Sequence, residues 1–198
     1  MKQFKIFMAI FVLLAIIFSV AEAADKPVRV ARLPILFQKR IPDSETCAIL
    51  ETKISRAVMI PLNGTLKLAD YLEPEKSALE LQKIWSKMRS DNRKVKIVET
   101  VRPLAKKLNA DIVVLPILLH YTEFSIQAGL NFETRHVSNV SAELIVYDRR
   151  TDELIDKKTS RSYNDGASKF GKASYLAGEC FDKLIDETNL KRKFMAIK

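Results

Sequence analysis

The chain has 198 residues, 47% of them hydrophobic, and a formal net charge of +9 from 33 basic and 24 acidic residues. This length and composition fit one globular domain with a full core, and they exclude a disordered chain. With five glycines, two histidines and two cysteines, the sequence contains no glycine-rich phosphate loop and no metal site at ligand spacing. We therefore expect neither a cofactor nor a metal.

The amino terminus has the parts of a bacterial secretory signal peptide. A short basic lead precedes an apolar run over residues 6–20, and Ala21 and Ala23 are the small residues that a signal peptidase reads. The alternative is a membrane anchor, but the run is shorter than the roughly 20 residues that a spanning helix needs. No cysteine follows that could carry a lipid. We predict that residues 1–23 are removed and that the chain is exported, periplasmic or secreted, without a lipid anchor.

The first half of the mature chain predicts helices separated by short extended segments. Leu50, Ile54 and Val58 form an apolar stripe at helical spacing. Pro74 lies between two acidic residues, a combination that suits the first turn of a helix. In chain order we expect a strand at 28–36, a helix at 44–59, a turn at 62–65, a short extended segment at 66–72, a helix at 73–90 and a short helix ending at Asn109.

The second half predicts most of the sheet and one long helix. Residues 110–115 are apolar on both faces and predict a central strand, which Pro116 interrupts before pairing resumes through Glu123. The polar segment 154–163 predicts an edge strand, which a turn at 148–152 joins to the strand before it. The other expected elements are a long connection at 125–137, a strand at 141–147 and an amphipathic helix at 168–189.

This order of elements predicts an α+β fold. We expect an α/β sandwich, in which a mixed, mostly antiparallel sheet of about four to five strands is flanked by helices. Residues 24–190 should form a single domain. A tail of basic and then apolar residues, 191–198, follows, and it is either a frayed end or a peripheral membrane contact.

Three segments of the chain resemble parts of known exported domains. Residues 28–35 resemble the opening strand, residues 109–114 the central strand, and residues 142–155 the strand, turn and strand of one group of proteins. This group comprises the curli-secretion lipoprotein family and the lipoprotein activators of penicillin-binding proteins, and the amino-terminal domain of the Tol-system propeller protein shares the general architecture. The resemblance implies an exported, non-enzymatic module that docks on other components of the cell envelope.

The sequence departs from this group at three points. Asp152 stands in the turn where the group commonly has glycine, and the lipid-anchored cysteine is absent. The connection expected at 125–137 is too short for the membrane hairpins of the pore-forming members. Pore formation is therefore not expected.

Cys47 and Cys180 are the two cysteines of the chain. An even number of cysteines in an exported chain predicts a disulfide, which would contribute roughly 4–5 kcal/mol by closing so long a loop. Both cysteines fall on expected helices, so a bridge requires that these helices are neighbours. The alternative is two buried free thiols.

Catalytic patterns are weak in this sequence. His120 lies next to a strand end and His136 in the expected connection, and neither is accompanied by a nucleophile motif. Asp111 opens an otherwise apolar strand, and we expect it to cap a helix or to form a salt bridge. An exported hydrolase would instead need a deep pocket that brings one histidine together with an acid and a hydroxyl.

The basic charge of an exported chain favours an anionic partner, and export argues against nucleic acid. We predict a non-enzymatic interaction module that binds an envelope protein or an anionic wall polymer, with an exported hydrolase acting on wall or lipid as the alternative. A further alternative is that the lysines only maintain solubility. The expected binding residues lie on the edge strand and in the tail, and they are Lys157, Lys158, Arg161, Lys191, Arg192 and Lys193.

Overall fold

The computed structural model describes residues 26–90, 94–128, 133–166 and 168–197. The predicted signal peptide lies outside the described residues. Within these ranges, no helix combines the length and the apolar character that crossing a membrane requires.

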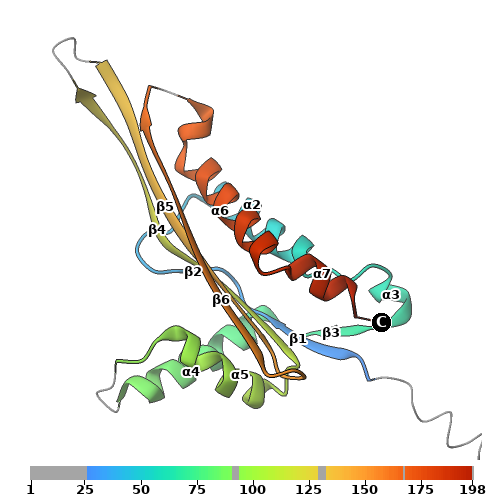
Figure 1. Ribbon diagram of the computed structural model, residues 1–198. Coiled ribbons are helices and arrows are strands. Elements are labelled where there is room, and N and C mark those ends of the chain that lie inside the picture. The colour runs from blue at the N-terminus through green and yellow to red at the C-terminus, as the bar shows by residue number, and fades with distance from the viewer. Residues whose placement is uncertain (1–25, 91–93, 129–132, 167, 198) are drawn as a thin grey trace, which may run out of the picture.

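One mixed sheet with the strand order β3-β1-β4-β5-β6 forms the centre of the fold, and β2 pairs with β4 beside this path (Figure 1). The pairs β1–β3, β1–β4 and β2–β4 are parallel, and the long pairs β4–β5 and β5–β6 are antiparallel. The predicted α+β fold with a mixed, mostly antiparallel sheet is confirmed. The strands are β1 (Val28–Arg32), β2 (Leu36–Phe37), β3 (Ala69–Tyr71), β4 (Ile112–Ala128), β5 (Glu133–Asp148) and β6 (Glu153–Asp165).

The expected long connection at 125–137 is wrong, because β4 extends into it up to Ala128 and β5 from Glu133 as a regular antiparallel pair. Register continues from Phe124 and Val137 to the last pair, Ala128 and Glu133. The polar side chains of this segment are compatible with a strand, since Ser125 and Ile126 are both exposed and no face needs to be apolar. The sequence does contain a short alternation here, Phe124, Ile126 and Ala128 with polar residues between them, which the expected connection left out of account.

The expected interruption at Pro116 is also wrong, since Pro116 pairs with Leu144 inside an unbroken β4. On its other side, β4 pairs with β1 up to Val114 and with β2 from Ile117 onward. Pro116 therefore lies in the gap between two partner strands, where β4 tolerates the loss of a backbone donor.

Helices cover both faces of the sheet (Figure 1). On one face lie α2 (Ser44–Ala57), α6 (Ala173–Glu187) and α7 (Leu190–Met195), and on the other lie α4 (Pro74–Ser90) and α5 (Val101–Leu108). The remaining short elements are α3 (Asn63–Leu66), η1 (Ile97–Thr100) and η2 (Lys169–Gly171). The segment predicted as one helix at 168–189 is thus η2 followed by α6, and the turn at 62–65 is largely the short helix α3.

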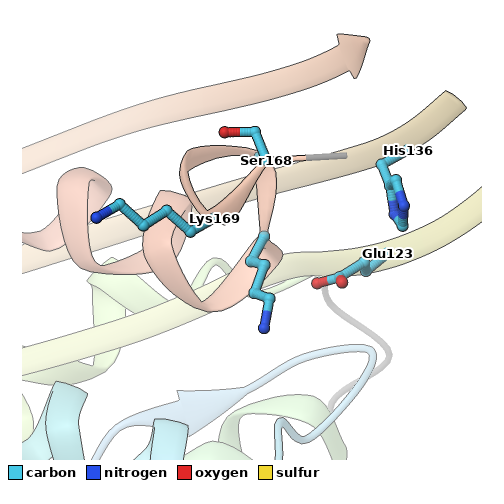
Figure 2. Close-up of a pocket in the computed structure, with 6 residues that line it drawn as sticks. Glu123, His136, Ser168 and Lys169 are labelled. Atoms are coloured by element: carbon cyan, nitrogen blue, oxygen red, sulfur yellow. The ribbon is translucent and has the colours of Figure 1, made fainter. Parts of the chain in front are cut away.

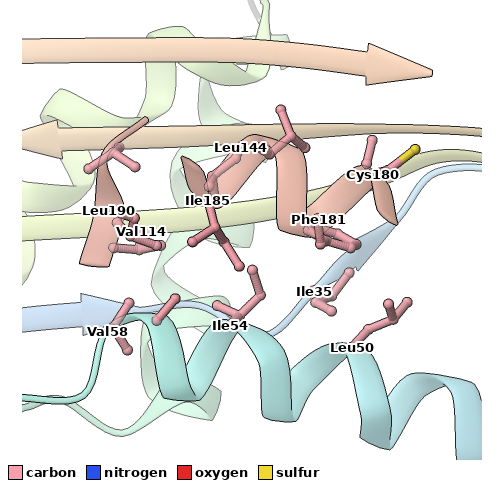
Figure 3. Close-up of a cluster of buried hydrophobic side chains, with 14 of the residues drawn as sticks. Ile35, Leu50, Ile54, Val58, Val114, Leu144, Cys180, Phe181, Ile185 and Leu190 are labelled. Atoms are coloured by element: carbon pink, nitrogen blue, oxygen red, sulfur yellow. The ribbon is translucent and has the colours of Figure 1, made fainter. Parts of the chain in front are cut away.

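Each face of the sheet has its own hydrophobic core. In the core under α2 and α6, Leu50 and Ile54 face Phe181 and Ile185 (Figure 3). The other core joins Leu104 and neighbouring residues of α5 to inward residues of β4. This two-layer burial follows from the apolar character of β4 on both faces.

The segment that follows α6 contributes to the first core. Phe194 is fully buried and Ile197 is 6% exposed, and both belong to the same cluster as Phe181. These side chains of the predicted tail therefore pack inside the protein, while Lys191 and Arg192 stay exposed.

The predicted disulfide is not formed, because Cys47 and Cys180 are both free. The two helices that carry the cysteines are neighbours, as a bridge would require. Lys53 of α2 forms an ion pair with Asp182 of α6, with 2.6 Å between Nζ and Oδ2. The cysteines nevertheless have different surroundings. The Cys180 thiol is buried in the core and points away from α2 (Figure 3), whereas the Cys47 thiol donates to the Pro42 carbonyl at 3.6 Å.

Candidate functional site: the β6 edge

β6 forms one edge of the sheet, as the polar sequence of this strand predicted. It is 13 residues long, and among the described residues its only strand partner is β5. The pairing runs without a bulge from Glu153 opposite Asp148 to Asp165 opposite His136. The backbone groups on its outer side are therefore a long regular row, which is the geometry that accepts an added strand.

The three basic side chains predicted on this strand point to two faces. Alternation places Lys157 and Arg161 on the α6 side, together with the partly buried Tyr163, and Lys158 on the opposite side. Arg161 Nε lies 3.9 Å from Glu179 Oε2 of α6, and Lys158 Nζ lies 3.2 Å from Glu143 Oε1 of β5. Within the described ranges Lys157 forms no ion pair. Lys157 is therefore the cation best placed to meet a partner, and Arg161, whose 3.9 Å contact with the partly exposed Glu179 is long, is the second.

Glu143 is a functional candidate that the sequence pattern missed. It sits between Ala142 and Leu144, on the opposite face of β5 from their side chains, and it is only 3% exposed. Burial raises the pKa of the Glu143 carboxyl, and nearby Asp156 adds to the increase while Lys158 opposes it. Lys158 therefore pairs with a buried acid of the same chain, which makes it a weaker candidate for binding a partner than predicted.

The second predicted basic group lies on α7, near the start of β6. Lys193 Nζ is 2.5 Å from Glu153 Oε2, the first residue of β6. Lys191 and Arg192 are exposed and form no ion pair with any residue that the structure describes. The ion pair of Lys193 thus brings the two predicted groups into one basic region along this side of the molecule.

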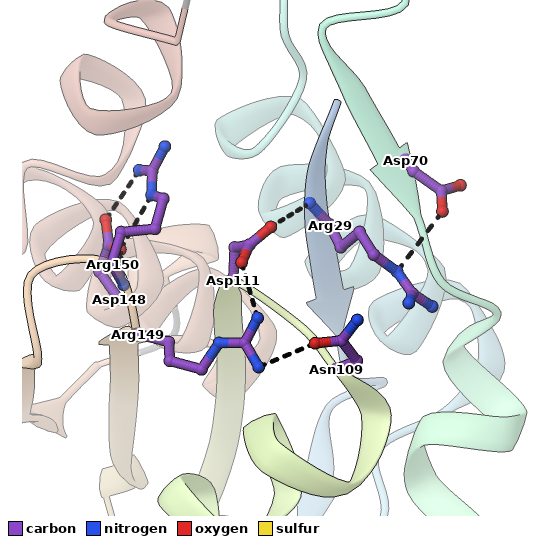
Figure 4. A network of polar contacts seen from close by, with 7 residues as sticks. All are labelled: Arg29, Asp70, Asn109, Asp111, Asp148, Arg149 and Arg150. Carbon is purple, nitrogen blue, oxygen red and sulfur yellow. Dashed lines mark hydrogen bonds and ion pairs between the residues drawn. The ribbon is translucent and has the colours of Figure 1, made fainter. Parts of the chain in front are cut away.

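The acid that opens the central strand has a structural role, in agreement with the expected salt bridge. Asp111 accepts a hydrogen bond from the Arg29 backbone N–H at 2.9 Å and forms an ion pair with Arg149 Nη2 at 2.9 Å (Figure 4). Arg149 also donates to the Asn109 side chain at 3.0 Å. The network ties the end of α5, β1 and the β5–β6 turn together.

A second network holds the turn that starts β6. Arg150 donates from Nε and Nη2 to the two carboxylate oxygens of Asp148, at 3.0 and 2.8 Å (Figure 4). Burial alone would raise the pKa of Asp148, but these charged hydrogen bonds outweigh it and the pKa lies below the usual range. The start of the edge strand is therefore rigidly placed.

His136 lines a cavity of ≈ 280 Å³ with Glu123 and Ser168, at the start of α6 (Figure 2). Glu123 Oε2 accepts the backbone N–H of Ala173 at 2.8 Å, and His136 Nδ1 lies 3.3 Å from the Ser125 hydroxyl. Figure 2 shows the Ser168 hydroxyl pointing away from His136. Among the described side chains the Ser125 hydroxyl contacts Nδ1 of His136 and none hydrogen-bonds Nε2, so no acid orients the ring as in a catalytic triad.

His120 lies on the other face of the sheet, apart from this cavity. Its Nε2 is 3.3 Å from the Thr122 hydroxyl, two residues along the same strand. Over the described ranges, no group of three or more metal-binding side chains occurs.

No protein-family model matches the sequence, and no curated protein is similar to it. Similar solved structures include the hypothetical protein CT253 of Chlamydia trachomatis, which is 16% identical at a TM-score of 0.45, over 87% of this chain and 99% of that one. Lipoprotein GNA1162 of Neisseria meningitidis is 15% identical at a TM-score of 0.35, over 82% of this chain and 99% of that one. The PelC dodecamer of Paraburkholderia phytofirmans is 16% identical at a TM-score of 0.38, over 85% of this chain and 91% of that one. Such distant likenesses assign no family, so the resemblance to the lipoprotein groups stays a prediction.

Proposed function

We propose that the protein is an exported interaction module of the cell envelope, which captures an extended segment of another envelope protein along β6. The observation that carries this proposal is the long, unbulged outer edge of β6, whose residues are mostly exposed and pair with no second strand in the described part of the chain. An added strand would obtain its affinity from main-chain hydrogen bonds and its specificity from side chains.

The basic side chains define the chemistry of the partner. Lys157 and Arg161 project from the same face four residues apart, a separation of roughly 13 Å along a strand. A captured strand lying roughly 4.8 Å away would present every second side chain to this face. The partner segment should therefore carry acidic residues about four positions apart, and Lys191 and Arg192 extend the basic surface past the start of β6.

Lysines on an edge strand also protect against unwanted pairing. Protection and docking make different predictions, because only docking requires a specific partner. An anionic wall polymer would depend on the same cations but would leave the backbone of β6 unpaired.

The test is an affinity capture from cell-envelope extract with the chain from residue 24 as bait. The double charge reversal Lys157→Glu with Arg161→Glu should lose a partner that the wild-type protein retains. The matched control, Lys87→Glu with Lys106→Glu, changes the net charge equally but lies on the α4 and α5 layer. Capture of a protein that survives the first pair of substitutions would overturn the role of β6, and capture of glycan alone would favour the wall polymer.

A hydrolase is the second candidate, because His136 lies 3.3 Å from the Ser125 hydroxyl beside Glu123. The two residues are direct cross-strand neighbours, which accounts for the contact without catalysis. Screening with ester and glycan substrates tests this candidate. Activity that disappears in both His136→Ala and Ser125→Ala would favour the enzyme over the docking module.

A further inference from the structure

The two outermost parallel strands lead into helices on opposite faces of the sheet. β1 and β3 are paired side by side, with Val30 opposite Tyr71. After β1 the chain passes through β2 and reaches α2 on the α6 side, and after β3 it enters α4 on the other side (Figure 1). Where neighbouring strands diverge in this way, a crevice opens beyond their carboxyl ends, and such crevices are the common ligand sites of open α/β sheets.

A cavity of ≈ 650 Å³ occupies this position, between α2 and the start of α4. This volume is in the range of about 300–1,000 Å³ that small-molecule sites occupy. Its apolar surface includes Met59, Tyr71 and Leu72, of which Met59 is 63% and Tyr71 39% exposed. Exposed apolar side chains around a hollow are the feature that distinguishes a binding site from ordinary surface.

The walls of the crevice are held by polar contacts inside the protein. Glu51 of α2 forms an ion pair with Arg32 at the end of β1 and accepts the Ile35 backbone N–H at 2.6 Å. The Tyr71 hydroxyl donates to the Val58 carbonyl at 2.6 Å. These contacts fix the two walls relative to each other, so a ligand would meet a preformed site.

The charges in the crevice leave one cation without a partner. Glu51 is neutralised by Arg32, and Glu73 by Lys76, whose Nζ lies 2.9 Å from Glu73 Oε2. Arg56 lines the same cavity, is exposed, and forms no ion pair with any described residue. The crevice therefore combines an apolar surface with a single available guanidinium group.

We propose that this crevice binds a small amphipathic anion, an apolar body that carries one carboxylate. The carboxylate would meet the guanidinium of Arg56, which suits a planar acid group. The apolar body would cover Met59, Tyr71 and Leu72. β3 and β6 are opposite edges of the sheet, so this site is independent of the docking proposed for β6.

Octanoate is the probe, with octanol as its neutral counterpart, in a titration followed by amide NMR of the ¹⁵N-labelled chain from residue 24. We expect saturable shifts of the backbone amides at residues 55–59 and 71–73. Arg56→Gln should weaken octanoate binding roughly tenfold, the size expected for one charged hydrogen bond, and leave octanol binding unchanged. Arg89→Gln, in the last turn of α4, is the control and should bind octanoate like the wild type.

The single tryptophan lines a second apolar cavity and reports on octanoate binding there. Trp85 lines a separate cavity of ≈ 690 Å³ with Leu36 and Leu79. Its fluorescence should stay constant during the octanoate titration. A change in Trp85 fluorescence, the absence of saturable shifts at the crevice, or equal octanoate affinity of wild type and Arg56→Gln would each overturn the proposal.

Discussion

Lys158 Nζ lies 3.2 Å from Glu143 Oε1 across β5 and β6, and the Glu143 side chain is only 4% exposed. Its pKa is raised by burial first and then by Asp156. A carboxyl whose pKa is higher in the folded state favours folding when it is protonated. This contribution is complete below the ordinary pKa of glutamate and is lost as the pH rises through the raised value.

Glu143→Gln should therefore gain stability relative to the wild type as the pH rises. We expect the difference in unfolding free energy to increase between about pH 4 and about pH 8, by about 1.4 kcal/mol for each unit by which the pKa is raised. Urea unfolding across this range measures it, with the surface variant Glu179→Gln as control. A difference that stays constant with pH would contradict the assignment of Glu143 as the buried titrating acid.

Gly171 has no room for a side chain. A Cβ at this position would lie 2.3 Å from the Tyr163 ring, whereas one at Gly64 would meet nothing within 4 Å. Gly171→Ala should lower the unfolding free energy by roughly 1–3 kcal/mol through overpacking, and Gly64→Ala should not destabilise the protein. Equal urea midpoints for the two variants would show that η2 does not pack on β6 as described.

Neighbouring positions on α7 should respond very differently to truncation. Phe194 is fully buried and Met195 is 65% exposed. Phe194→Ala should lower the unfolding free energy by about 3–5 kcal/mol, and Met195→Ala should change it by less than about 0.5 kcal/mol. Thermal or urea unfolding separates the two. If Phe194→Ala were as stable as Met195→Ala, the tail would be outside the core.

The two thiols should differ in reactivity. Burial raises the pKa of Cys180 to about 11, which leaves on the order of 0.1% thiolate at pH 8. Cys47 is half-buried. In the native protein, iodoacetamide should modify Cys47 first and leave Cys180 untouched until the protein unfolds. Mass spectrometry counts the added groups, and a denatured, unreduced chain without reactive thiols would show that the cysteines are bridged.

Helix positions and the polar edge strand could be predicted from the sequence because their signals are local. The stripe through Leu50 and Ile54 identifies α2, and the polar segment that follows the turn at 148–152 identifies β6 as a strand with little burial. The extension of β4 past Phe124 has only a short signal in the sequence, the alternation of Phe124, Ile126 and Ala128 with polar residues, and Gly129 directly after it favours a loop.

The candidate sites depended on information that a single sequence does not contain. The sequence around Glu143 does not indicate that a carboxylate is buried there, and the packing around β5 buries it. Arg56 and Tyr71 line one crevice because α2 and α4 lie on opposite faces of the sheet, a choice that their amphipathic patterns do not specify. The contact between Lys193 and Glu153 likewise follows from the position of α7.

Amide hydrogen exchange tests the central claim, the docking of a partner strand on β6, most directly. The chain from residue 24 is measured alone and in complex with the envelope protein that it captures. Outward-facing amides of β6, residues 153–165, should exchange rapidly in the free protein and become protected in the complex, while residues 112–118 of β4 stay unchanged. Protection confined to other elements, with β6 exchanging as in the free protein, would contradict the account.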